Sequence, residues 1–292
     1  MNRLIKTALL ALAAAFVLTG CLGGDGHGHD ESERSARIAR GFYQEVIVDR
    51  NLARFDAYVG SSYLQHATGY ADGVQPLRDE LTAHAASSNQ VQILRVVAEG
   101  PYAALHSLWT IGTQQVLYVD VWRIENGKLV EHWDQFQNVP ATAANGNTMH
   151  AGPDADPRAP QDLERNRARA LAVLRVFDNL ADLSPVQDFV SEAYIQHNPT
   201  VADGKQAFLQ MLAGLRDAGY RSRTRVAKTI AYGDMVLVHS QVVDTSVPND
   251  PGTGAMDLFR FDAQGRIVEH WDVLESMTGT SLNTNDPFSY PG

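Results

Sequence analysis

Acidic and imidazole side chains recur in matching places in the two halves of this 292-residue chain. The tetrapeptide Glu-His-Trp-Asp occurs at 131–134 and again at 269–272. In each half an Asp-x-(Trp/Phe)-Arg segment comes before it, beginning at Asp120 in the first copy and at Asp257 in the second. Carboxylates and imidazoles are the groups that proteins use most to move protons.

The surroundings of the two upstream aspartates indicate which proton chemistry they suit. Asp120 shares a strand face with Trp122, and Asp257 shares one with Phe259. A carboxylate on an aromatic face loses hydration, which raises its pKa toward neutral pH and suits it to take a proton from a carbon next to a carbonyl. Such catalysis supplies about 10²–10⁴-fold, so we expect an activated carbonyl substrate.

A purely structural interpretation stays open beside this one. Asp120 and Asp257 would then be buried carboxylates paired with a histidine or with backbone. In the repeated tetrapeptide, Trp would pack, Glu would pair with Arg, and the remaining side chains would be solvated. This is the interpretation that we favour for four residues: His132, His270, Asp134 and Asp272.

Periodicity in each half predicts helices first and strands afterwards. The predicted helices include 74–86 and 205–218, and His84 has no counterpart in the second copy, so we expect it at the surface. The predicted strands are 91–98, 103–110, 117–124 and 129–136, with counterparts at 223–231, 235–244, 255–261 and 267–274. Helices followed by an antiparallel meander indicate an α+β fold.

The last hairpin decides which side chains share a pocket. Asn126-Gly127 is typical of a two-residue type I′ turn, which would pair Asp120 with Trp133. A three-residue loop with Gly265 would likewise pair Asp257 with Trp271. Cross-strand neighbours share a face, so six residues are predicted to line the pockets: Trp122, Glu131, Trp133, Phe259, Glu269 and Trp271. A one-residue shift in register would exchange the two faces.

Length and composition agree with a duplicated globular domain. Two units of this size are each long enough to hold a core. The boundaries that we predict are a signal peptide at 1–20, a Gly- and His-rich flexible tether at 21–32, a first domain at 33–140, a linker at 141–160, a second domain at 161–278 and a C-terminal tail at 279–292. A net charge of −10 with no basic cluster argues against nucleic acid as a partner.

The ordered motifs resemble those of the SnoaL-like polyketide cyclases, in the nuclear transport factor 2-like superfamily. Each half contains Tyr-x-Gln-His, Asp-Gly, a strand His, Asp-x-(Trp/Phe)-Arg and Val-Glu-His-Trp-Asp in this order. The resemblance covers most of each half. It implies two tandem cone-shaped α+β barrels, each a curved sheet wrapped round helices with a deep pocket.

The resemblance also implies which residues carry the activity. In these cyclases a pocket aspartate is the acid and base of an aldol condensation without a cofactor, and the similar positions here are Asp120 and Asp257. A pocket histidine matches His106 and His239, and the Tyr-x-Gln-His motif supplies His66 and His197. Two histidines and one aspartate would also suit a facial metal site, which the spacing does not separate from a proton relay. We expect no metal and no cofactor.

The N-terminus predicts where the protein works. Arg3 and Lys6 precede an apolar run, and Leu18-Thr19-Gly20 leads to Cys21, the single cysteine. This order is typical of a secretory signal and resembles the bacterial lipobox. We therefore expect Cys21 to be lipidated and the protein to be an extracytoplasmic lipoprotein, attached to a membrane by its lipid anchor only.

Two functions remain open at this level. One is an enzyme that condenses, cyclises or isomerises a small apolar carbonyl compound. The other is an anchored binding protein that holds a small hydrophobic ligand without turnover. In both cases we expect the two repeats to pack through their sheets as a pseudo-dimer, because the outer faces are apolar and need a cover; these faces carry Val119, Val121 and Val130 in the first copy and Met256, Leu258 and Val268 in the second.

Overall fold

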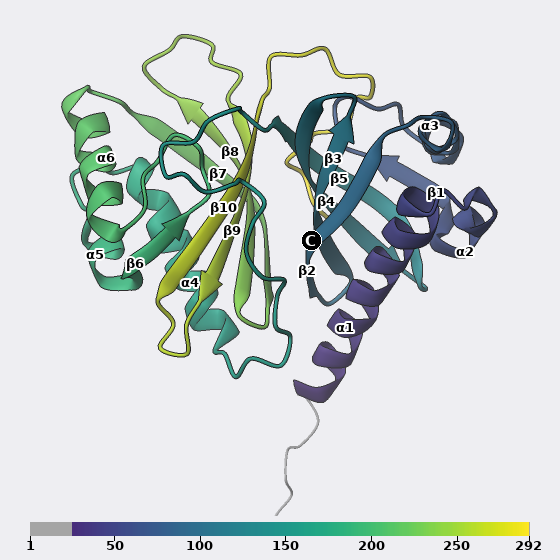
Figure 1. Cartoon of the computed structure of the whole chain (residues 1–292), viewed down its shortest axis with the longest axis horizontal. Coiled ribbons are helices and arrows are strands. Elements are labelled where there is room, and N and C mark those ends of the chain that lie inside the picture. Colours follow the sequence, from purple (N-terminus) through teal and green to yellow (C-terminus); the bar gives the residue numbers. More distant parts are fainter. Residues whose placement is uncertain (1–24, 292) are drawn as a thin grey trace, which may run out of the picture.

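The chain folds into two similar halves, each built from one five-stranded sheet and several helices (Figure 1). This computed structural model describes residues 25–291. The predicted signal peptide, Cys21 and residues 21–24 of the predicted tether lie outside the described residues. Within the described part, no helix is both long enough and apolar enough to cross a bilayer.

The first half begins with a helix that starts earlier than we predicted. Residues 25–32, which we assigned to a flexible tether, form the first turns of α1. The hydroxyl of Ser35 donates to the carbonyl of Gly100 at 2.7 Å, and the amide of Gly100 donates to Ser32 Oγ at 2.9 Å, so the helix is fastened to the turn between β2 and β3. The elements of this half are α1 (Asp25–Phe42), a π-helical turn (Tyr43–Val48), a 3-10 turn (Leu52–Arg54), α2 (Phe55–Tyr58), β1 (Val59–Gln65), α3 (Val74–Ala85), β2 (Gln90–Glu99), β3 (Tyr102–Ile111), β4 (Gln114–Glu125) and β5 (Lys128–Asn138).

The second half repeats this order. Its elements are α4 (Leu163–Leu174), a 3-10 turn (Arg175–Phe177), α5 (Ser184–Phe189), β6 (Val190–Gln196), α6 (Lys205–Asp217), β7 (Ser222–Tyr232), β8 (Met235–Asp244), β9 (Thr253–Phe261) and β10 (Ile267–Ser276). The duplicated α+β architecture is therefore confirmed.

Each sheet contains one strand that the sequence pattern did not reveal. The strand orders are β1-β5-β4-β3-β2 and β6-β10-β9-β8-β7. The last four strands of each half form the expected antiparallel meander, but β1 and β6 run parallel to β5 and β10. This pairing sets Gln65 beside His132 and Gln196 beside His270.

The predicted register of the last hairpin is wrong by one residue. The turn itself is as expected, because Asn126 and Gly127 both have positive φ and Glu125 pairs with Lys128. Beyond the turn, Ile124 pairs with Leu129 but Arg123 pairs with Glu131, so one extra residue, Val130, bulges out of β5. A bulge shifts the pairing by one residue and exchanges the faces of everything beyond it.

The second half has the same bulge in β10. Phe261 pairs with Ile267 and Arg260 with Glu269, which leaves Val268 unpaired. As a result Asp120 lies opposite Asp134, and Asp257 opposite Asp272. Histidine and aspartate of the repeated tetrapeptide therefore share the face of the upstream aspartate, and its tryptophan and glutamate lie on the other face.

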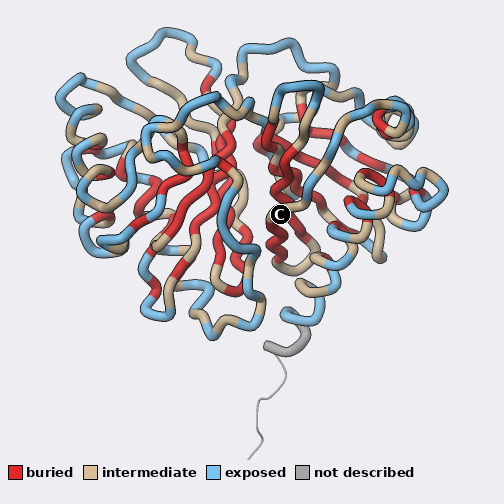
Figure 2. Tube along the Cα trace, viewed as in Figure 1, coloured by how far each residue is buried: buried red, intermediate tan, exposed pale blue. Residues whose placement is uncertain are grey.

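The sheets face each other in the middle of the molecule and the helices lie on the outer sides (Figure 1). Figure 2 shows the buried residues concentrated along the strands of both sheets. A single apolar cluster crosses the boundary, with Val119 and Val121 from the first half and Met256 and Leu258 from the second. The expected pseudo-dimer, packed through its sheets, is therefore present.

Two hydrogen bonds across this interface are related by the pseudo-symmetry. The backbone amide of Phe136 donates to Glu275 Oε2 at 3.3 Å, and the backbone amide of Leu274 donates to Gln137 Oε1 at 2.9 Å. Gln137 and Glu275 hold equivalent places at the ends of β5 and β10. The interface thus has one neutral and one ionisable group at equivalent places.

The segments that follow β5 and β10 each lie against the opposite half. After β5, the side chain of Asn147 donates to the carbonyl of Gln196 at 3.0 Å, and Trp271 donates to the carbonyl of Ala151 at 2.7 Å. After β10, Asn285 donates to the carbonyl of Gln65 at 2.8 Å, and Trp133 to the carbonyl of Ser289 at 2.9 Å. The predicted linker and tail are thus a pair of exchanged segments.

Candidate functional site

A cavity of about 670 Å³ lies in the first half, between helices α1 and α3 and the face of the sheet that is turned away from the second half. Its lining is rich in aromatic side chains: Phe42, Tyr43, Tyr63, Tyr70, Trp109, Tyr118 and Trp122. His84 lines it too, although we expected this residue at the surface. His84 is buried and its Nε2 lies 2.9 Å from the carbonyl oxygen of Ile47, which belongs to the turn after α1.

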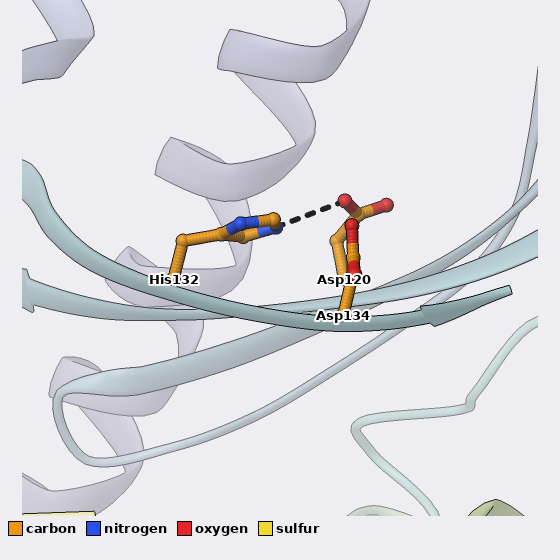
Figure 3. A group of neighbouring side chains, drawn as sticks. All are labelled: Asp120, His132 and Asp134. Atoms are coloured by element: carbon orange, nitrogen blue, oxygen red, sulfur yellow. Dashed lines mark hydrogen bonds and ion pairs between the residues drawn. The ribbon is translucent and has the colours of Figure 1, made fainter. Parts of the chain in front are cut away.

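Three polar side chains from β4 and β5 meet in this cavity: Asp120, His132 and Asp134 (Figure 3). The two carboxylates come from residues paired directly across the strands, and His132 Nε2 lies 3.0 Å from Asp120 Oδ1. All three residues are buried. The bulge at Val130 creates this cluster, because without it His132 and Asp134 would point to the opposite face.

A third residue, Gln65, shows which nitrogen of His132 carries a hydrogen. Its Oε1 accepts the backbone amide of Ala67 at 2.9 Å, which fixes the orientation of the side-chain amide, and the same oxygen lies 3.0 Å from His132 Nδ1. An amide oxygen only accepts, so Nδ1 carries a hydrogen. The contact from Nε2 to Asp120 then needs one more proton, and His132 and Asp120 share it.

A chain of hydroxyl and indole groups reaches the other oxygen of Asp120. Tyr43 donates to Asp120 Oδ2 at 3.2 Å, and Trp109 Nε1 donates to the Tyr43 hydroxyl at 2.9 Å. The Tyr43 hydroxyl also lies 2.7 Å from Ser107 Oγ. Burial, reinforced by the charge of Asp120, raises the pKa of Tyr43 well above its usual value. Tyr43 therefore keeps its proton and remains a hydrogen-bond donor.

Asp134 is the unpartnered member of the cluster. Among residues 25–291 no side chain or backbone group donates to its carboxyl group. Burial raises the pKa of Asp134 well above the usual range, and the negative charges of Asp120 and of Glu275 raise it further. Asp134 therefore holds a proton at a pH where an exposed aspartate is ionised, next to a carboxylate that is anchored by His132 and Tyr43.

The second half has a cavity of about 440 Å³ with the same three polar groups. His270 Nε2 lies 3.1 Å from Asp257 Oδ1, and His270 Nδ1 lies 3.0 Å from Gln196 Oε1. Burial opposes the charged form of His270, but the hydrogen bond to Asp257 and the charge of Asp272 outweigh it and raise the pKa. Burial also raises the pKa of Asp272.

The two pockets differ in how their carboxylates are held. In the second pocket Leu174 and Val242 take the places of Tyr43 and Trp109, so no hydroxyl of residues 25–291 donates to Asp257. Asn198 replaces Ala67 and donates to Asp272 Oδ2 at 2.7 Å. The first pocket thus anchors its upstream aspartate, and the second anchors the aspartate of the tetrapeptide.

Two of the histidines that we predicted in the pockets lie elsewhere. His106 and His239 are buried on the opposite faces of their sheets, which meet at the interface between the two halves. His106 Nδ1 lies 3.2 Å from Arg95 Nη1, and burial, with the charge of Arg95, holds the pKa of His106 well below its usual value. His239 Nδ1 lies 2.7 Å from the hydroxyl of Tyr290, and burial lowers the pKa of His239 to about 3.

The histidines of the Tyr-x-Gln-His motif fasten the exchanged segments. His66 stacks on Trp133 and its Nε2 lies 2.8 Å from Glu131 Oε1, and its Nδ1 lies 2.8 Å from the carbonyl oxygen of Asp286 in the tail. The second half repeats this arrangement with His197, Glu269, Trp271 and the carbonyl of Thr148. The four residues Glu131, Trp133, Glu269 and Trp271 therefore line the interface side, and the pockets contain Trp122 and Phe259.

The residues that sequence reasoning missed are His132, Asp134, His270 and Asp272, which we expected to be solvated. A signal for them was present in the chain. A structural strand end needs a hydrophobic anchor and a polar tip, but not the same tetrapeptide in two copies that differ at most other positions. The identity of the two tetrapeptides therefore pointed to a shared role for both polar residues.

The three polar residues of each pocket, which we call its triad, also offer atoms that could bind a metal ion. In both pockets one imidazole nitrogen and two carboxylate oxygens lie within 4.8 Å of one another. One imidazole with two carboxylates resembles the facial sets that hold divalent transition metals.

Comparisons with known proteins agree with this description. The family model described as the SnoaL-like domain matches residues 39–132 and 171–270. A search of the curated proteins returned no match.

Three solved structures illustrate the similarity. A protein from Kribbella flavida, provisionally assigned as a ketosteroid isomerase, is 18% identical with a TM-score of 0.34, over 46% of this chain and 95% of its own. An epoxide hydrolase of the LEH-like type from M. tuberculosis is 18% identical with a TM-score of 0.32, over 37% and 85%. An NTF2-like protein of unknown function from Mesorhizobium loti is 20% identical with a TM-score of 0.34, over 37% and 94%. Each of the three matches covers less than half of this chain.

Proposed function

The chain belongs to the SnoaL-like family as a tandem pair of domains, and from this premise we propose that its first pocket catalyses proton transfer next to the carbonyl group of a small apolar compound. The reaction is an isomerisation or an aldol-type cyclisation that needs no cofactor. The observation that carries the proposal is the buried pair of adjacent carboxyl groups, one anchored as an acceptor and the other raised in pKa as a donor.

Each group has a distinct role in this reaction. Asp120 takes the proton from the carbon next to the carbonyl through Oδ2, while His132 holds Oδ1 and Tyr43 steadies the carboxylate. The protonated Asp134 donates a hydrogen bond to the carbonyl oxygen and so stabilises the enolate that forms. Asp120 then returns the proton to the substrate, so no net charge is left in the pocket. A protonated carboxyl group that stabilises an enolate is a known solution in apolar sites.

The lining supports an apolar substrate. Aromatic side chains surround the triad, and the cavity of about 670 Å³ has room for a compound of drug size. We also propose that the protein works outside the cytoplasm, held at a membrane by acyl chains on Cys21. The support is the order of charged, apolar and small residues before the single cysteine.

The test is exchange of hydrogen for deuterium at carbons next to a carbonyl, because exchange does not require the natural product to be known. A panel of small apolar ketones and 1,3-diketones is incubated with the protein in D₂O and followed by NMR. We expect Asp120→Asn to reduce exchange by about 10²–10⁴-fold. Asp257→Asn, the equivalent change in the second pocket, is the matched control and should leave the rate unchanged.

Two outcomes count against the proposal. Undiminished exchange in Asp120→Asn would show that another group takes the proton. Binding of a panel compound to the first pocket without any exchange would favour the alternative function, a non-catalytic binding protein for a small hydrophobic ligand.

A further inference from the structure

We propose that the second pocket is a binding site for a divalent transition-metal ion, held by His270 Nε2 and by carboxylate oxygens of Asp257 and Asp272. This inference goes beyond the proposed function, which concerns the first pocket. Mixed imidazole and carboxylate donors suit first-row ions such as Mn²⁺, Fe²⁺, Co²⁺ and Zn²⁺.

The first observation is the orientation of His270. Gln196 Oε1 accepts the backbone amides of His197 and Asn198, both at 2.9 Å, so the oxygen is the atom that faces His270 Nδ1. That contact places a hydrogen on Nδ1, so Nε2 is the nitrogen that faces Asp257 Oδ1, 3.1 Å away. Two electron-rich atoms at this separation need a cation between them. A metal-bound histidine usually donates its other ring N–H to an acceptor, as His270 does to Gln196.

The second observation is a pair of buried oxygens without hydrogen-bond partners among the described residues, Asp257 Oδ2 and Asp272 Oδ1. Asp257 is 6% exposed and Asp272 is 7% exposed, so water does not solvate them freely. Asn198 donates a hydrogen bond to Oδ2 of Asp272, which leaves Oδ1 available to a metal ion. A single proton between His270 and Asp257 leaves both oxygens unsatisfied, whereas a metal ion in the triad reaches all three side chains.

Charge and space agree with a dication. Metal binding displaces the protons of its ligands. With His270 neutral and Asp257 and Asp272 ionised, the three groups carry two negative charges, which a divalent ion balances. The donor atoms lie within 4.8 Å of one another, and they open on a cavity of about 440 Å³. Three protein ligands with free space on one side leave coordination positions for water or for a ligand.

The first pocket shares the histidine orientation and the spacing of the three groups, but it lacks the pair of fully buried oxygens without partners. Tyr43 already donates to Asp120 Oδ2, and Ala67 stands where Asn198 orients Asp272. Both oxygens of Asp120 have partners, and although none of the described residues donates to Asp134, neither of its oxygens is among the fully buried unpartnered atoms. The two copies have thus diverged, with a proton-transfer pocket in one and a metal pocket in the other.

The test is titration of the purified full-length protein with Co²⁺, followed by visible d–d absorption. The chain carries His27→Gln and His29→Gln, so that the N-terminal histidines do not contribute. We expect one Co²⁺ per chain. Asp272→Asn should weaken binding by more than about 100-fold, because even the loss of a group that only supports a ligand costs about 10–100-fold. Asp134→Asn, the equivalent substitution in the first pocket, should bind Co²⁺ like the parent.

Gln196→Leu provides a second variant that keeps all three ligands, and we expect about 10–100-fold weaker binding from it. Thermal unfolding in EDTA verifies that each variant is folded, and Asp257→Asn replaces Asp272→Asn if that variant is not. The inference is overturned if the parent protein binds no Co²⁺, or if the ligand variant binds as tightly as Asp134→Asn. Deuterium exchange in EDTA reports on the first pocket separately, so either proposal can fail alone.

Discussion

Glu275 should make the stability of the pseudo-dimer depend on pH. This half-buried carboxyl group lies at the interface between the sheets and accepts the backbone amide of Phe136. Burial raises its pKa from 4.5 to about 7. Below pH 4.5 the group is protonated in the folded and the unfolded chain. Between pH 4.5 and about 7 the folded protein holds a proton that the unfolded chain releases, so stability falls as pH rises.

The size of the effect follows from this shift. A rise from 4.5 to about 7 corresponds to at most about 3.4 kcal/mol, at about 1.36 kcal/mol for each pKa unit. Solvent screening of a half-buried group reduces this to about 1–2 kcal/mol. Glu275→Gln removes the charge and keeps an oxygen for the Phe136 amide. We therefore expect it to match the wild type at pH 4 and to be more stable by about 1–2 kcal/mol at pH 8.

The pseudo-symmetry supplies a matched control. Gln137 holds the equivalent place and accepts the Leu274 amide at 2.9 Å. Gln137→Glu should lower stability at pH 8 by a similar amount and have no effect at pH 4. Urea unfolding followed by tryptophan fluorescence measures all three proteins, because Trp133 and Trp271 are buried near the interface. A Glu275→Gln variant that is no more stable than wild type at pH 8, or equally stabilised at pH 4 and pH 8, would refute the reasoning.

Three further predictions follow from other features. Deuterium exchange should decrease as pH rises through the raised pKa of Asp134, and Asp134→Asn, whose amide still donates at high pH, should flatten that limb; an unchanged profile would speak against a protonated Asp134. Gly152→Ala should cost about 2 kcal/mol or more in urea unfolding, since Gly152 has a φ of +106° and the new Cβ would lie 2.6 Å from Trp271. Gly146→Ala, at φ +74° with no atom within 4 Å, is the control, and an equal loss there would leave only the backbone cost. Cys21→Ser should abolish lipidation and membrane retention, which the intact mass of membrane-extracted protein reveals, and a variant still processed and retained would contradict the lipoprotein assignment.

The local parts of the fold were readable from the sequence. Helix periodicity, the meander and the Asn126-Gly127 turn all depend on residues close together in the chain, and these predictions are confirmed. The repeated motifs revealed the duplication in the same way, because both copies keep the same order of elements.

The predictions that failed concern structural features that leave no local pattern in the sequence. The bulges fall at Val130 and Val268, residues that look like ordinary strand members, yet each reverses the faces of the residues beyond it. Because the predicted register omitted the bulge in β5, it placed His132 and Asp134 outside the pocket and Glu131 and Trp133 inside it. The parallel strand β1 was missed because its partner lies more than sixty residues away, at Leu129 and His132.

The exchanged segments have a consequence for how the protein is made. His66, in the first half, contacts the carbonyl of Asp286, which is 220 residues further along the chain. Trp133 likewise stacks on Tyr290, near the last described residue. A ribosome must therefore have added Asp286 before the first half can complete its native contacts, and contacts so distant in sequence slow folding. Expressed alone, the first half would leave Trp133 uncovered, so we expect each repeat to depend on the other for its full stability.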